Sequence, residues 1–199
     1  MDVFLQSTEI INWKQSDVLR LARSLAYGVG NRLDTAKRCF EWVRDEIKHS
    51  SDYRLNPVTC AASEVLAART GFCYAKSHLL VALLRANSIP AGLCYQRLSI
   101  DGPGGPYCLH GLTAAFFQDI GWYRVDPRGN KPGVNAQFSP PEERLAFPIQ
   151  VKGEAHLPEI WSEPLSIVIE ALRAHQTFDS LVQHLPDVPL IAMEGGGNC

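Results

Sequence analysis

Three residues could together carry out acyl-transfer chemistry: Cys73, His110 and Asp126. A cysteine thiolate is a strong nucleophile, a histidine can take the proton from the thiol, and a carboxylate can orient that histidine. Each residue alone has a plainer interpretation as a small buried thiol, a strand-end histidine or a turn aspartate. Their order along the chain, and the elements expected to carry them, favour a joint role as nucleophile, base and orienting acid.

Cys73 is expected to lie in the first turn of a helix. An apolar run with spacings of three and four follows it and ends before Pro90, which cannot continue a helix. The run consists of Leu79, Leu80, Ala82, Leu83 and Leu84. The free N–H groups and the positive dipole end of a helix N-terminus favour a thiolate over a thiol.

His110 and Asp126 are expected to lie at the same end of a β-hairpin. Residues 109–117 and 122–126 read as strands, and the Gln118–Gly121 segment carries a turn signal centred one or two residues beyond Gln118. A small offset or a bulge between His110 and Asp126 is therefore expected. Because alternate residues share a face, the face of His110 also carries Leu112 and Ala114, and we expect this face to pack on the Cys73 helix.

The remaining pattern predicts helices before the sheet and hence an α+β fold. Further helices are expected over residues 16–27, with Ser16 as N-cap, and over 34–48, 61–68 and 164–175, and a weak strand over 91–98. We expect a single domain over 1–199, with a core at about 34–127, a C-terminal extension over about 128–194 and a flexible tail at 195–199.

Composition limits the possible partners. The chain has 199 residues, 46% hydrophobic and 20% charged, with a net charge of −2. This balance gives no electrostatic argument for binding nucleic acid or an anionic membrane. The N-terminus has no signal-peptide pattern, and no uncharged segment reaches transmembrane length. Six scattered cysteines in a chain of this size favour reduced thiols and a cytoplasmic location.

The other histidines and motifs are weaker candidates for a functional site than Cys73, His110 and Asp126. His78 projects away from Cys73 on the same helix, and His49, just after a helix, is expected to be a C-terminal cation. A metal site built from Cys94, Cys108 and His110 lacks a fourth ligand and paired short spacings. No phosphate-binding or dinucleotide motif occurs, and we expect neither a metal nor a cofactor.

At this point the sequence resembles the core of the transglutaminase-like superfamily. The resemblance covers about residues 34–127 and is carried by three segments: Ser63–Leu98, with its Gly-Phe-Cys and Arg-Ala-Asn-Ser-Ile-Pro-Ala, His110-Gly111, and Gly121–Pro127. It implies a papain-like α+β core with Cys73 as nucleophile, His110 as base and Asp126 as orienting acid. The family includes transglutaminases, peptidases, amidases, deglycosylating enzymes and inactive relatives. The chain departs from the family pattern with Phe72 and Tyr74 beside the cysteine and Leu112 after His110-Gly111.

The expected activity is thiol-dependent acyl transfer on an amide or peptide bond through a thioester, by hydrolysis or by transfer to an amine. The substrate would be a peptide, a protein or a small amide. The Cys73 N–H is one expected oxyanion donor. Tyr53, which the resemblance places in a suitable loop, is a candidate for the second, and Phe72 and Tyr74 are candidates for substrate contact. The alternative is a catalytically inactive binding or scaffold module with the same fold.

Overall fold

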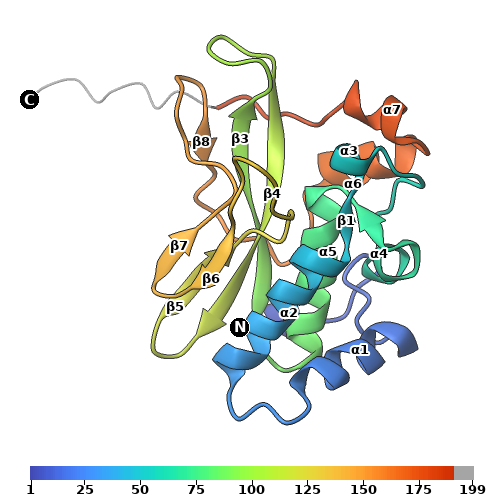
Figure 1. Ribbon diagram of the computed structural model, residues 1–199, viewed down its shortest axis with the longest axis vertical. Coiled ribbons are helices and arrows are strands. Elements are labelled where there is room, and N and C mark those ends of the chain that lie inside the picture. The colour runs from blue at the N-terminus through green and yellow to red at the C-terminus, as the bar shows by residue number, and fades with distance from the viewer. Residues whose placement is uncertain (191–199) are drawn as a thin grey trace, which may run out of the picture.

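A computed structural model of the chain describes residues 1–190 and has α5 (Cys73–Ala86) at its centre (Figure 1). Every residue from Cys73 to Arg85 is buried. Other helices pack on one side of α5, and the main sheet packs on the other side. A helix that is buried on all sides needs apolar residues on most of its circumference, which the leucine-rich segment supplies. Its buried Lys76 and Arg85 donate to the backbone carbonyls of Ile47 and Ala91.

The helices match the predicted ranges to within about two residues. Ser16 is the first residue of α1 rather than its cap, because the N-cap is Gln15 and no side chain caps this end. By contrast, Asn31 caps α2 by accepting the Asp34 N–H at 2.8 Å. The helices besides α5 are η1 (Asp2–Leu5), α1 (Ser16–Ala26), α2 (Arg32–Glu46), α3 (Ser50–Tyr53), α4 (Ala62–Ala68), α6 (Ser166–Ala174) and α7 (Phe178–Val182).

The main sheet is antiparallel with the strand order β5-β4-β3-β8. The predicted hairpin is confirmed, since β4 and β5 pair Phe117 with Gly121 and Thr113 with Val125, which centres the turn on Asp119. Two small sheets join β1 to β2 in parallel and β6 to β7 antiparallel. The strands are β1 (Lys48–His49), β2 (Thr70–Gly71), β3 (Ala91–Ser99), β4 (Tyr107–Phe117), β5 (Gly121–Val125), β6 (Gln137–Ser139), β7 (Glu142–Arg144) and β8 (Ala155–His156).

The expectation about the two faces of β4 is wrong. The face toward α5 carries Gly111 and Thr113, and Thr113 Oγ1 donates to the Ser77 carbonyl at 3.4 Å. The opposite face carries Leu112 and Ala114, which form a second apolar cluster with Cys94. This cluster is covered by Trp122, Leu145 and Ile160. Both faces are buried, so alternation alone could not assign the face that meets the helix.

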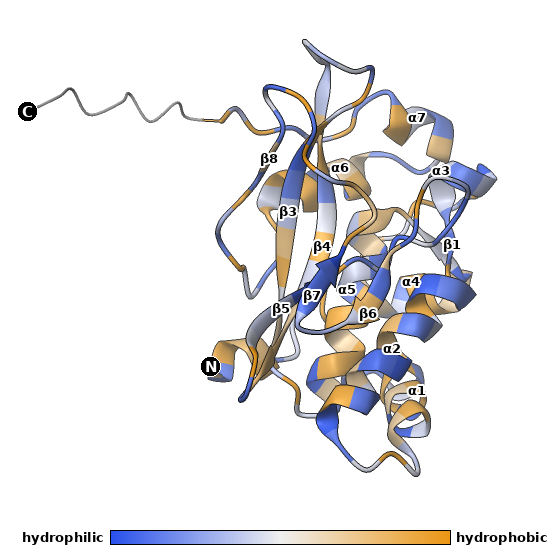
Figure 2. Cartoon of the chain, turned by 60° about the vertical axis from the view of Figure 1, so that its left-hand side comes forward, coloured by the Kyte–Doolittle hydropathy of each residue, from blue (hydrophilic) through white to orange (hydrophobic). Residues whose placement is uncertain are grey.

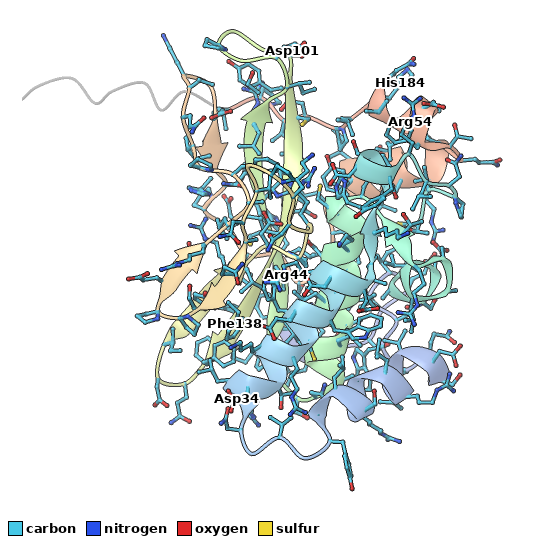
Figure 3. All side chains as sticks on the ribbon, in the orientation of Figure 1. Asp34, Arg44, Arg54, Asp101, Phe138 and His184 are labelled. Atoms are coloured by element: carbon cyan, nitrogen blue, oxygen red, sulfur yellow. The ribbon has the colours of Figure 1, made fainter. Side chains whose placement is uncertain are left out.

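Residues after 127 are part of the same packed structure. The strand β8 extends the sheet at β3, and the backbone of Trp161 exchanges two hydrogen bonds of 2.8 Å with that of Leu93. Phe138 of β6, labelled in Figure 3, packs against Phe40 of α2 and Tyr123 of β5. The tail predicted at 195–199 lies outside the described residues.

The surface pattern follows from this layering. Figure 2 shows hydrophilic and hydrophobic residues alternating along α1 and α2, as expected for helices with one buried side, and a hydrophilic β7. Across residues 1–190, no helix combines the length and apolarity needed to cross a membrane. In the same part of the chain, Cys39, Cys60, Cys73, Cys94 and Cys108 are free thiols.

Candidate active site

Cys73 is the first residue of α5, as the sequence predicts. The preceding residue, Phe72, is the N-cap, and no side chain caps the first turn. The first backbone hydrogen bond of the helix runs from Lys76 N–H to the Phe72 carbonyl. The N–H groups of the first turn therefore remain available to an anion beside Cys73.

The sulfur of Cys73 lies at the edge of β4. The pairing of β4 with β5 ends at Thr113, and beyond that point the Gly111 N–H donates to Cys73 Sγ at 3.5 Å. A side chain at position 111 could not fit, because its Cβ would lie 2.9 Å from Tyr74 Cα. Gly111 thus allows the start of α5 to approach the strand that carries His110.

His110 is held between Asp126 and Cys73. Its Nε2 lies 2.7 Å from Asp126 Oδ2, which leaves Nδ1 as the ring nitrogen available to Cys73. Burial disfavours a charge on the ring, but Asp126 and the Cys73 sulfur outweigh it and raise the pKa of His110 to about 10. The phenyl ring of Phe147 packs edge-on against the imidazole at 5.1 Å between ring centroids.

Asp126 is fully buried and has several donors around it. Oδ1 accepts the Arg128 N–H at 3.0 Å, and Oδ2 accepts the Ala146 N–H at 3.1 Å in addition to His110. Burial alone would favour the neutral acid, but His110 and these N–H groups hold the pKa of Asp126 below its usual value. An ionised Asp126 beside a protonated His110 is the arrangement that stabilises an imidazolium.

These side chains line a cleft of about 510 Å³. Cys73 and His110 are 7% and 5% exposed, so both lie at the bottom of the cleft. Much of the wall is apolar, namely Leu98, Ile100, Leu109, Phe147, Val182 and Leu185. Part of this wall comes from α7 and the residues after it, a contribution that the sequence pattern did not indicate.

The structure brings two of the three secondary candidates to this cleft. Phe72 is 3% exposed and stacks on Phe178 at 6.2 Å, with an interplanar angle of 18°. Tyr74 is also buried, and its hydroxyl donates to the Leu109 carbonyl, which ties α5 to β4. Tyr53 is 60% exposed and lines a neighbouring pocket without Cys73, so the structure does not bring it to the thiol.

Two further residues line this cleft, Arg128 and His49, and neither is expected there from the sequence. Arg128 is 6% exposed and forms two hydrogen bonds of 2.8 Å with the Asp52 carboxylate. His49 was expected to be a helix-terminal cation, but it lies in β1, is 7% exposed and lines the cleft with Cys73. Burial, together with the charge of Arg128, holds the pKa of His49 well below its ordinary value, so the ring is neutral. The pairing of β1 with β2 that brings His49 here has no local sequence signal.

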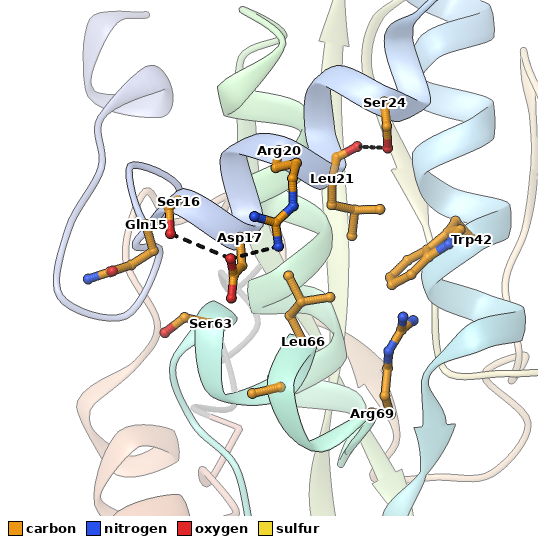
Figure 4. Close-up of a pocket in the computed structure, with 11 residues that line it drawn as sticks. Gln15, Ser16, Asp17, Arg20, Leu21, Ser24, Trp42, Ser63, Leu66 and Arg69 are labelled. Carbon is orange, nitrogen blue, oxygen red and sulfur yellow. Dashed lines mark hydrogen bonds and ion pairs between the residues drawn. The ribbon is translucent and has the colours of Figure 1, made fainter.

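A second hollow of about 520 Å³ lies between α1, α2 and α4, away from these residues (Figure 4). It contains the Asp17–Arg20 ion pair and the Arg69 guanidinium over the Trp42 ring at 4.8 Å from its centroid. Its polar groups are thus largely paired with each other. Within residues 1–190, no three His, Cys, Asp or Glu side chains are grouped to hold a metal ion.

Helices packed on an antiparallel sheet, with a cysteine at the start of the central helix and a His–Asp pair on adjacent strands, make this a papain-like fold. The chain belongs to the transglutaminase-like superfamily, whose family model matches residues 19–127, more than half of the chain. No curated protein matches it. Both the fold and the family expected from the sequence are therefore confirmed.

Solved structures of similar fold share little sequence with this chain. A proposed cysteine protease from Cytophaga hutchinsonii is 21% identical with a TM-score of 0.50, over 63% of this chain and 40% of that one. The periplasmic domain of TgpA from Pseudomonas aeruginosa is 22% identical with a TM-score of 0.47, over 62% and 45%. The chain thus spans less than half the length of the solved structures it matches.

Proposed function

We propose that this protein is a cysteine-dependent acyl-transfer enzyme that cleaves an amide or peptide bond through a thioester on Cys73. The observation that supports it is the buried His110, hydrogen-bonded to Asp126 at 2.7 Å, which lines the bottom of an open cleft together with Cys73. A cysteine whose only role is packing needs no ionised neighbours. Membership of the superfamily supports the same chemistry.

The reaction begins with proton transfer from Cys73 to Nδ1 of His110. The thiolate attacks the substrate carbonyl, and the Cys73 N–H at the free end of α5 donates to the developing oxyanion. His110 then gives its proton to the leaving nitrogen, which departs as an amine and leaves a thioester on Cys73. Asp126 holds the ring in place and stabilises the imidazolium throughout.

Water or a second amine then attacks the thioester, with His110 again accepting the proton. We propose hydrolysis as the main outcome, with transfer to an amine as the alternative for the same intermediate. The apolar wall of the cleft suits an acyl group with an apolar side chain. Peptides, proteins and small amides are the substrate classes that fit, and we propose that the enzyme acts in the cytoplasm with reduced thiols.

The test is the reactivity of Cys73 toward iodoacetamide between pH 5 and 9, read by mass spectrometry of each cysteine-containing peptide. Cys73 should be alkylated rapidly below pH 8. Cys108 is an internal control in the same cleft, because burial and the neighbouring Cys73 raise its pKa to about 12 and keep it a thiol. If Cys73 reacts no faster than the thiols of the unfolded chain, the protein is an inactive module instead. Acylation by a panel of nitrophenyl esters and peptide amides would then define the acyl group.

A further inference from the structure

We propose that His49 is a further catalytic residue: its Nε2–H donates the second hydrogen bond to the substrate oxyanion, opposite the N–H of Cys73. The proposal rests on the proposed function, since an oxyanion forms only if Cys73 attacks a carbonyl. Oxyanion sites commonly use two donors, and the Cys73 N–H at the start of α5 supplies one of them. His49, from a separate element, is a candidate for the second.

The backbone holds His49 next to the nucleophile. In the parallel ladder of β1 and β2, His49 pairs with Gly71, two residues before Cys73. The imidazole packs edge-on against the ring of Phe72, with 5.9 Å between centroids and 62° between planes. Because strands in a ladder lie about 5 Å apart, His49 is fixed beside the free end of α5 rather than on a mobile loop. It lines the same cleft as Cys73 and His110.

The ring of His49 is buried but lacks the hydrogen bonds that buried histidines normally make. Nδ1 is closed off from solvent and has no partner within residues 1–190. The nearest carboxylate oxygen, Asp52 Oδ2, is 3.9 Å away, which is too far for a hydrogen bond. Asp52 is engaged instead by Arg128 at 2.8 Å and by Lys131 at 2.6 Å. Leaving a buried polar atom unpaired costs roughly 1–3 kcal/mol of folding free energy. The unpaired Nδ1 of His49 therefore needs an explanation, and a catalytic role of the ring provides one.

The charge state of His49 suits an oxyanion donor. Burial and the nearby Arg128 keep the imidazole neutral, so it carries a single N–H. A neutral ring does not compete with His110 for the proton of Cys73 and does not change its charge near neutral pH. Nε2 is the ring nitrogen that is not sealed off by protein, so the proton must be on Nε2 for the ring to act in the cleft.

Two reactions of Cys73 separate this role from a structural one. Alkylation by iodoacetamide displaces iodide and forms no oxyanion, whereas acylation by p-nitrophenyl acetate passes through one. In His49→Phe, which keeps a ring of similar size without a donor, we expect unchanged alkylation and an acylation rate 10²–10³-fold lower, as for the loss of one oxyanion donor. His49→Gln places an amide nitrogen near the former Nε2 and should retain most of the acylation rate. His49→Asn, whose amide reaches only the position of Nδ1, should not.

The outcomes distinguish this proposal from the proposed function. Wild-type acylation in folded His49→Phe would overturn the role of His49 alone. An equal loss of alkylation and acylation would also overturn it, because His49 would then only support the structure. Circular dichroism gives the folded fraction of each variant, and the comparison of His49→Gln with His49→Asn stands if the phenylalanine variant does not fold. A wild-type protein that is alkylated but never acylated would overturn the proposed function, and with it this proposal.

Discussion

Replacing Asp126 with asparagine exchanges one carboxylate oxygen for an NH₂ group and so tests the role of the carboxylate with little change in shape. The carboxylate accepts from His110, Arg128 and Ala146, and both of its oxygens are used. An amide keeps the shape but turns one acceptor into a donor. The better orientation keeps the carbonyl oxygen toward His110 and Ala146 and points the NH₂ group at the Arg128 N–H. One buried donor then loses its acceptor, which costs about 1–3 kcal/mol of unfolding free energy.

The effect on reactivity should be larger than the effect on stability. Burial lowers the pKa of His110, and Asp126 is the first of the groups that raise it to about 10. If the pKa returns to the ordinary 6.5, proton transfer from Cys73 to His110 becomes roughly 10³-fold less favourable, since each pKa unit is a factor of ten. The loss of ring orientation adds to this, as the roughly 10⁴-fold loss for the same substitution in a serine protease illustrates. We therefore expect acylation to fall by about 10³-fold or more.

The assay measures alkylation and acylation of Cys73 from pH 6 to 9 together with the melting temperature. The matched control is Glu143→Gln, the same chemical change in an ion pair with Arg124 at the sheet surface, with an N–O distance of 2.6 Å. The control should retain the wild-type rates. If Asp126→Asn reacts within threefold of wild type at pH 7 while melting a few degrees lower, Asp126 is only a structural turn residue and the reasoning is refuted.

Three further predictions concern the same site. His110→Ala should abolish turnover and move alkylation of Cys73 to higher pH, and an unmoved pH profile would exclude His110 as the base. Gly111→Ala should lower the unfolding free energy by about 1–3 kcal/mol, since the new methyl group meets the Tyr74 backbone; the control Gly30→Ala, whose Cβ meets nothing within 4 Å, should not. Burial opposes but Asp126 dominates the raised pKa of His110, so the folded state keeps a proton that the unfolded state loses above pH 6.5. The contribution of His110 to the unfolding free energy should therefore be lost as pH rises from 6.5 to about 10. Because Lys76 and the buried thiols also titrate in this range, the quantity to measure by chemical denaturation is the difference between wild type and His110→Gln, which should shrink as pH rises.

The sequence by itself determined the local features of the site. The apolar spacing after Cys73 fixes the start of α5, because a helix buries residues three and four apart. The turn signal near Asp119 sets the pairing of β4 with β5, which leaves His110 and Asp126 at the same end of the hairpin. The family also follows from these motifs. These features depend on residues close together in the chain, and for such residues the sequence spacing determines their relative positions.

Only the tertiary structure decided which groups surround those residues. Alternation shows that His110 shares a face with Leu112, but α5 approaches the other face, where Gly111 leaves room for Tyr74. The Ala146 N–H that holds Asp126 comes from a segment with no regular pattern. His49 reaches the cleft through a two-residue parallel ladder that periodicity cannot reveal. These contacts join distant segments, and they are set by steric fit and by the pairing of buried polar groups, which depend on the whole fold.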